Sequence, residues 1–451
     1  MIFESVISKI NSWHKSGEDN LHITGLDSAQ FSFIINECEK DIDFVKKNSF
    51  VFICDSIDQA ENLYESFKAS RITKKLLFFP GHDLSPYSEA VSSQRALFER
   101  FKVLSYLTST GDKDTFILIS TFESFSLRIP PREFFKDQIF KLEVSDIIPP
   151  SELASKLVSL GYSSSPSIEE PGTFSSKGEI FDIFTVDSTP IRIHYFDDMI
   201  EEIFLIDLET QKSKKESKLE SIDITPTPQV FGMQDIFAHK LRENIPMPST
   251  AQKNRYSKRK EIFSSLSDNY LFDNYAAFAP LFFDKSEVLL DYLPKNSIKV
   301  LFNDVEFSRA YSDFFEQLRL EFELEWQNVD NDNLLPEPIK LYDTHLEKTL
   351  EQTPHISIDD LNFANAIRDD LKNTIDLKIM PSTGYLNQTI NPSLNKAEYT
   401  KAMFEFIIKE FTSTGNIYFS YEHDNSKNEF YHLMEVFKLD PNLKSRFHFT
   451  R

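Results

Sequence analysis

Alternating residues between Glu169 and Ile206 place the strongest limit on how this chain folds. Apolar and polar residues nearly alternate through three runs, at 179–184, 191–195 and 200–205. Glycine, proline and aspartate residues separate the runs. A period of two residues is typical of strands with one buried face, and these separators are typical of tight turns. The stretch therefore predicts a small antiparallel meander within an α+β domain.

The first part of the chain has a different pattern of apolar residues. Short apolar runs predict strands near 21–24, 50–55, 76–79 and 116–121. Helical patterns cover 1–20, the region from the first strand to Lys47, and 56–69. Because strands that alternate with helices pair in parallel, we expect an α/β fold with a helix-covered parallel sheet.

The charge of the chain argues against one broad class of partner. The 451 residues carry a formal net charge of −22, with a pI of about 4.9. Phosphate binding needs clustered Lys and Arg, so we do not expect a general nucleic-acid surface. The basic run KSKKESK at 212–218 is predicted to be a solvated turn, with a phosphate contact as the alternative.

Cysteines and apolar runs indicate the compartment. Cys38 and Cys54 are too few for a disulfide framework or a cysteine metal site, and we expect inert buried thiols in a reducing compartment. The first 20 residues lack the regions of a signal peptide, and no run reaches the roughly 18 apolar residues of a membrane helix. We expect a cytoplasmic protein with no membrane contact, no metal and no cofactor.

The residue order within the meander is specific. The segments FSSKGEIFDIF (174–184) and IRIHYFDDMIEEI (191–203) resemble the signature of domain 2 of the excision-repair protein UvrB. They also resemble the matching module of the transcription-repair coupling factor, Mfd. Both families run roughly F-x-x-R-G-x-x-x-D-[IL]-F, then R-[VL]-[DE]-F-F-x-[DE]-x-I-[DE]. In both families this domain docks UvrA, the damage-sensing ATPase.

Three further segments resemble the coupling factor. They are FPGHDLSPY at 79–87, SSQRALFERFKVL at 92–104 and YAAFAPLFF at 275–283. UvrB carries a long DNA-clamping β-hairpin near the first of them. Only a short span separates Tyr87 from Arg95, so there is no room for that hairpin here. The omission favours the coupling factor over UvrB.

The resemblance covers most of residues 20–340 and implies a division into four parts. Residues 1–138 resemble UvrB domain 1a with a degenerate P-loop, and 227–340 resemble domain 1b. Between them, 139–226 resemble domain 2, inserted after a linker near 137–142 and including a helix from Ser151, its N-cap, to Gly161. Residues 341–451 are predicted to form a separate small α/β domain, with strands at 375–380 and 416–420 and helices at 396–412 and 428–437.

The stretch Thr24-Gly25-Leu26-Asp27-Ser28-Ala29 lies between a strand and a helix, the context of a phosphate-binding loop. Against the UvrB-type loop T-G-S-G-K-T, Asp27 replaces glycine, Ser28 replaces lysine and Ala29 replaces the hydroxyl residue. Glycine lets backbone N–H groups approach phosphate, lysine balances its charge and the hydroxyl ligates Mg²⁺. We therefore expect no nucleotide binding, whether the loop is a relic or an ordinary turn capped by Asp27 or Ser28.

The resemblance also carries over a UvrA-docking patch, with departures. Lys177 stands at the arginine of the R-G pair, Ser175 at a second arginine of UvrB, and His194 at an acidic position, while Arg192 matches. Lysine supplies charge but not a bidentate fork. Phe174 and Phe184 are either apolar anchors or core residues. The predicted partner-binding set is Phe174, Ser175, Lys177, Gly178, Phe184, Arg192 and His194.

The sequence holds no GKS, GKT, HExxH, GxSxG or CxxC motif, and we predict no catalytic residue. The resemblance implies a non-catalytic adaptor that recruits UvrA to RNA polymerase stalled at DNA damage. The translocase motor, which also binds RNA polymerase and DNA, would lie in an absent C-terminal part and contact this part intramolecularly. Two alternatives stay open: an autoinhibitory or structural scaffold for the motor, and a DNA-dependent ATPase.

Overall fold

A computed structural model describes most of the first 359 residues and short stretches beyond them. The described ranges are 2–17, 20–39, 41–69, 72–82, 85–87, 94–110, 114–233, 235–244, 264–265, 275–302, 304–327, 336–359, 373–376, 398–399, 401–402, 405, 417–420, 424–436 and 447–450. Within these ranges no helix has the length and apolar character needed to cross a membrane.

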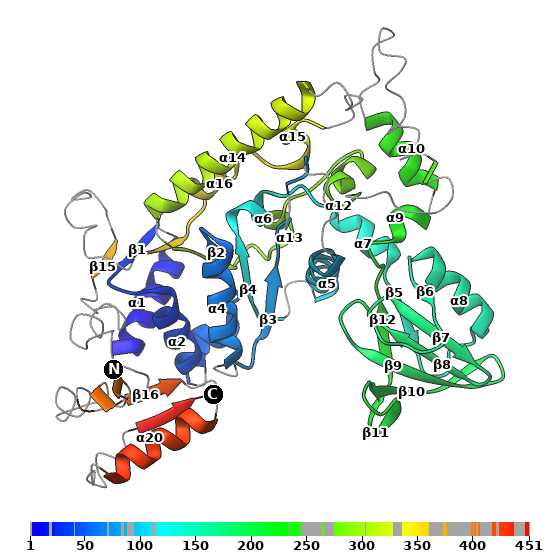
Figure 1. Cartoon of the computed structure of the whole chain (residues 1–451), viewed down its shortest axis with the longest axis horizontal. Helices are drawn as coiled ribbons and strands as arrows, with labels where there is room; N and C mark the ends of the chain where they lie inside the picture. The colour runs from blue at the N-terminus through cyan, green and yellow to red at the C-terminus, as the bar shows by residue number, and fades with distance from the viewer. Residues whose placement is uncertain are drawn as a thin grey trace.

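A seven-stranded parallel sheet forms the centre of the molecule, in the order β15-β1-β14-β13-β2-β4-β3 (Figure 1). This confirms the predicted α/β class. The strands are β1 (Leu21–Thr24), β2 (Phe50–Cys54), β3 (Lys75–Phe79), β4 (Phe116–Thr121), β13 (Ile298–Phe302), β14 (Ile356–Asp359) and β15 (Thr374–Asp376).

Helices cover both faces of this sheet because its strands are apolar on both sides. In β2, Phe50 and Phe52 belong to one buried cluster and Val51 and Ile53 to another. The first cluster contains residues of α1 (Ile2–Ser16), α2 (Ser28–Glu39), α3 (Asp43–Lys47) and α4 (Ile57–Ala69). The second contains residues of α5 (Gln94–Thr110), α6 (Phe122–Ser126), α7 (Arg132–Gln138) and α14 (Asp304–Gln327). The helix predicted to run up to Lys47 is thus two helices.

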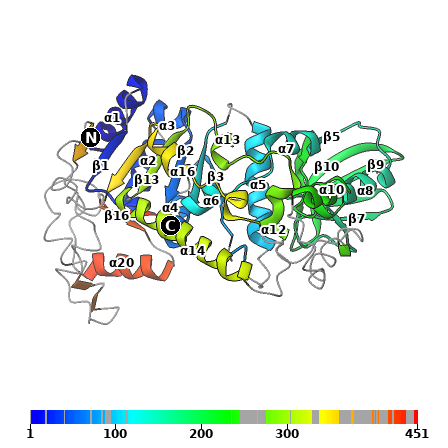
Figure 2. The same ribbon diagram turned by 90° about the horizontal axis from the view of Figure 1, so that it is seen from above.

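A second domain lies to one side of the main sheet (Figures 1 and 2). It is a six-stranded sheet in the order β11-β10-β9-β8-β7-β6. Its elements are α8 (Pro150–Ser159), β6 (Ser163–Ser164), β7 (Thr173–Lys177), β8 (Ile180–Phe184), β9 (Pro190–Phe196), β10 (Met199–Asp207) and β11 (Lys212–Leu219). The strands from β7 to β11 pair antiparallel, as the alternating pattern predicts.

Two paired strands carry the chain into and out of this domain. β5 (Phe140–Glu143) enters and β12 (Ser221–Ile224) leaves, and they pair antiparallel along their whole length. The predicted linker near 137–142 is therefore the end of α7 and most of a strand. The chain leaves the first domain and returns at one place, as an inserted domain requires.

Three sequence expectations differ from the structure. Residues 212–218 are strand β11 rather than a turn, because an edge strand accepts exposed lysines that discourage further pairing. The N-cap of α8 is Pro149, with Pro150 in the first turn, so Ser151 lies inside the helix. β14 and β15 belong to the main sheet, so these two strands are not part of a separate domain.

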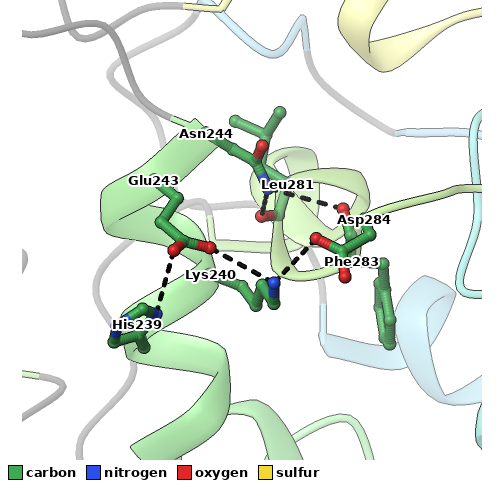
Figure 3. Close-up of polar contacts among 7 residues, drawn as sticks. All are labelled: His239, Lys240, Glu243, Asn244, Leu281, Phe283 and Asp284. Atoms are coloured by element: carbon green, nitrogen blue, oxygen red, sulfur yellow. Dashed lines mark hydrogen bonds and ion pairs between the residues drawn. The ribbon is translucent and has the colours of Figure 1, made fainter.

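After domain 2 the chain forms short helices: α9 (Val230–Met233), α10 (Asp235–Asn244), α12 (Tyr275–Phe278), the 3-10 helix η2 (Ala279–Phe282) and α13 (Leu289–Tyr292). Figure 3 shows the polar contacts between the C-terminal end of α10 and the segment that comprises the end of η2 and the residues just after it. Lys240 Nζ lies 2.7 Å from Asp284 and 3.2 Å from Glu243. Asn244 donates a 2.8 Å hydrogen bond to the carbonyl of Leu281. The returning chain is thereby joined to α10 by an ion pair and by a hydrogen bond from a side chain to the backbone.

Beyond residue 376 the described parts are few. β16 (Ile417–Ser420) and β17 (Phe447–Thr450) pair in parallel, and α20 spans Asp424–Val436. The first strand and the helix agree with the predicted 416–420 and 428–437. Most of the predicted helix at 396–412 and the end of the predicted strand at 375–380 lie outside the described residues.

Candidate functional site

The loop between β1 and α2 has the strand-loop-helix setting of a nucleotide site, but its polar groups are bonded within the protein. The backbone N–H groups of Gly25 and Leu26 both donate to the carbonyl of Asp359 in β14, at 2.9 and 3.5 Å. Leu26 itself is buried in the core. Backbone N–H groups that cradle a phosphate in a P-loop are thus directed to a neighbouring strand instead.

Asp27 caps the helix that follows. Its Oδ1 accepts a 2.7 Å hydrogen bond from the N–H of Gln30, while its own N–H donates to Oε1 of Gln30 at 3.1 Å. This reciprocal pair is a capping box. The carboxylate therefore occupies the helix N-terminus, where a phosphate would otherwise be attracted. Thr24 is buried in β1, and Ser28 and Ala29 begin α2.

The second candidate site is the domain 2 sheet, whose two faces differ. Because side chains alternate along a strand, Ile191, Ile193 and Tyr195 of β9 face inward. They pack in one cluster with Leu153 and Leu157 of α8. Arg192, His194 and Phe196 therefore point to the opposite side, which we call the outer face. The strand register places Lys177 and Ile180 in one row with His194 on this face.

Three of the predicted docking residues are buried. Phe174 is 3% exposed and stacks on Phe181 at 5.5 Å, so it belongs to the inner core. Phe184 is 5% exposed and packs with Ile168 and Ile206. Ser175 is 4% exposed, and its hydroxyl donates to the carbonyl of Pro166. For both phenylalanines the structure thus selects the core alternative, and none of the three side chains is accessible to a partner.

Arg192 is occupied by an ion pair. Its Nε and Nη2 donate to the two carboxylate oxygens of Asp182, at 2.7 and 2.8 Å, and its Nη1 donates to the carbonyl of Gln211. The hydrogen bond to Asp182 holds the pKa of Arg192 above its ordinary value. The side chains are only 18% and 12% exposed. The guanidinium fork is therefore used to join β8, β9 and the β10–β11 turn.

Lys177, Gly178 and His194 remain accessible. Lys177 and Gly178 form the exposed tip of the β7–β8 hairpin, with Gly178 at φ +62°. His194 is half-buried, and its ring meets Phe204 edge-on at 5.7 Å. On this outer face Lys218 pairs with Glu202 at 3.2 Å. The face thus presents a mixed surface with a lysine at the hairpin tip.

The sequence reasoning missed Phe196 as a surface residue. This side chain is 68% exposed at the end of β9. The signal was present, since Phe196 continues the outward phase of Arg192 and His194. Aromatic residues are enriched in protein interfaces relative to the rest of the surface, so Phe196 is a candidate contact residue.

Comparison with known proteins defines the class to which this architecture is related. Residues 140–229 match the family model described as "UvrB interaction domain", and these limits nearly coincide with the inserted domain between β5 and β12. The inserted domain is therefore similar to the UvrB interaction domain.

Over a longer span the chain is similar to transcription-repair-coupling factors. It is 27% identical over 359 residues to that of Bacillus subtilis (strain 168), covering 76% of this chain and 28% of the relative. It is 26% identical over 330 residues to that of Rickettsia bellii (70% and 28%) and 25% identical over 299 residues to that of Staphylococcus epidermidis (63% and 24%). These matches confirm the resemblance seen in the meander. The chain spans 24% to 28% of the length of these relatives.

Proposed function

We propose that this chain is the N-terminal, UvrA-recruiting part of a transcription-repair coupling factor. The observation that supports it most is the match of residues 140–229 to the UvrB interaction domain, within a chain similar to coupling factors. The geometry adds that α8 packs on only one face of this domain. The outer face, which α8 does not cover, carries Lys177, His194 and Phe196. Recruitment is then a matter of protein docking, with no chemistry in this part.

The ATP-driven motor and the contacts with RNA polymerase and DNA belong, in this proposal, to the remainder of a longer protein. An intramolecular contact between that motor and this part, and a cytoplasmic location, are parts of the same proposal. The domain division also remains a proposal: 1–138, 139–226, 227–340 and 341–451, with β14 and β15 of the last unit pairing in the main sheet.

The proposed absence of catalysis rests on the loop at 24–29. Two of its backbone N–H groups are bonded to Asp359, and Asp27 occupies the helix N-terminus. We expect no heat of binding when ATP and Mg²⁺ are titrated into the chain, and no hydrolysis in the presence of DNA. Binding at micromolar ATP would favour the DNA-dependent ATPase alternative.

A titration against purified UvrA tests the docking proposal. We expect the complete 451-residue chain to bind UvrA, and Lys177→Glu and His194→Ala to weaken binding by about fivefold or more each. Lys285→Glu is the matched control, since Lys285 is also an exposed lysine but lies outside domain 2. Arg192→Glu is unsuitable because it breaks the pair with Asp182. A chain that binds no UvrA would leave the scaffold alternative.

A further inference from the structure

Two exposed apolar side chains, Ile147 and Phe196, and the half-buried Met199 between them form a row at one end of the domain 2 sheet. Ile147 is 80% exposed and Phe196 is 68% exposed, the two highest values among the large apolar residues of this domain. Ile147 lies opposite Met199 in an antiparallel bridge, and Met199 lies opposite Phe196 across the β9–β10 turn. Residues directly opposite in antiparallel pairs project to the same side. We call these three side chains the ridge.

The ridge is continuous with the outer face. Phe196 follows His194 by two residues on β9, and the N–H of Tyr195 donates to the carbonyl of Glu179 beside the β7–β8 hairpin tip. The ridge therefore extends the row of accessible residues from Lys177 across to the segment before α8. An apolar row of this kind adds contact area to a surface otherwise made of mixed charges.

The backbone holds the ridge in a fixed shape. Ser145 N–H donates to the carbonyl of Ile200, Ile200 N–H to Asp146 and Ile148 N–H to Asp198, at 2.8 to 2.9 Å. Asp197 has φ +58°, the left-handed conformation that a tight hairpin turn requires and that aspartate tolerates. A pre-formed surface loses little conformational entropy on binding, which favours affinity.

Carboxylates surround the far end of the ridge. Asp197 and Asp198 are exposed in the turn between Phe196 and Met199, and Asp146 precedes Ile147. The Asp146 carboxylate accepts a 2.8 Å hydrogen bond from the N–H of Glu143, and among the described residues none of the three aspartates forms an ion pair. Negative charge at this end is therefore available to a partner.

We propose that Ile147, Met199 and Phe196 are the apolar centre of a docking surface, and that its partner presents an apolar recess bordered by Lys or Arg. The inference rests on the proposed function, because it takes UvrA as the protein that carries the recess. It adds two features that the carried-over basic patch lacks: an apolar anchor before α8, and an acidic border. Lysine at one end and aspartates at the other give the surface a fixed orientation.

The anchor is tested by titrating UvrA against the complete chain carrying Ile147→Ser or Phe196→Ser. Each is expected to weaken binding at least about tenfold, as central apolar contacts do. Leu324→Ser is the matched control, since Leu324 is also 68% exposed but lies on α14. Because these side chains are mostly in solvent, we expect unchanged circular dichroism and thermal midpoints.

The negative charge proposed for the border of the ridge is tested by two substitutions at Ile147. Ile147→Lys and Ile147→Glu both remove the apolar contact, but lysine meets the proposed cations of the partner. We expect Ile147→Lys to bind at least about fivefold more weakly than Ile147→Glu, with the difference shrinking at high salt. The reverse order would overturn the acidic-border assignment.

The possible failures are distinct. If Lys177→Glu weakens UvrA binding while Ile147→Ser and Phe196→Ser behave like Leu324→Ser, the ridge proposal is wrong and the docking function stands. If the unaltered chain binds no UvrA, both proposals fail together. If the ridge variants weaken binding and Lys177→Glu does not, the ridge alone carries the contact.

Discussion

Gly161 packs closely against the chain that returns from domain 2, and its replacement by alanine gives a sharp test. It follows α8 with φ +86°. A Cβ there would overlap Thr227 Oγ1 and would lie 2.5 Å from the nitrogen of Val230 and 2.8 Å from the carbonyl carbon of Gln229. Two of these atoms are backbone and cannot rotate away. Either α8 or the chain at 227–230 must shift.

The expected cost is the sum of separate effects. Placing alanine in the left-handed region costs about 1 to 2 kcal/mol. The overlap costs about 1 to 3 kcal/mol more. The shift also weakens the hydrogen bonds from Thr227 to the carbonyls of Leu160 and Gly161, at 2.9 and 2.8 Å. We therefore expect Gly161→Ala to lower the free energy of unfolding by about 3 to 5 kcal/mol.

Gly178→Ala is the matched control. Gly178 has φ +62°, but no atom lies within 4 Å of its added Cβ, so only the backbone cost of about 1 to 2 kcal/mol applies. Urea denaturation of the complete chain, with hydrogen exchange of peptides from 173–207, measures both variants. A loss for Gly161→Ala within about 0.5 kcal/mol of the control would refute the steric reasoning.

Two further predictions concern charged groups. Arg192→Ala leaves the Asp182 carboxylate nearly buried and unpaired, so we expect a loss of about 2 to 4 kcal/mol by urea denaturation; a loss near zero would mean that water replaces the guanidinium without cost. Desolvation, then the charge of Arg100, holds the pKa of His82 well below its ordinary value. Below pH 6.5 this histidine is therefore protonated in the unfolded state but stays neutral in the folded state. The free energy of unfolding should decrease by about 1 kcal/mol for each pH unit as the pH is lowered from 6.5 to 5. His82→Gln should flatten that slope, and an equal slope in both proteins would contradict the assignment.

Local structure was predicted well from the sequence where the order of apolar and polar residues directly reflects which side chains are buried. Alternation in 179–205 defined β8, β9 and β10, and the apolar runs defined four strands of the main sheet. The substitutions at Asp27, Ser28 and Ala29 also indicated an altered loop, although the hydrogen bonds to Asp359 required the structure. That contact joins residues more than 300 positions apart, which no local pattern reveals.

The candidate site was predicted less well because it depends on strand register. Asp182 and Arg192 are ten residues apart, and only the pairing of β8 with β9 shows that they are direct neighbours. The same register separates the buried Phe174 from the accessible Lys177. β11 was missed because its polar residues at a sheet edge carry no burial signal. β14 was missed, and the strand predicted at 375–380 was not assigned to the main sheet, because parallel pairing is non-local.

The paired strands β5 and β12 have a mechanical consequence. Each runs between the two domains, so a force that pulls domain 2 away stretches both strands together. The hydrogen bonds between them are not sheared, because neither strand slides past the other. The tension is shared by these two segments of the polypeptide. The connection should therefore hold under load until one of the two domains begins to unfold, a useful property in any tether between moving partners.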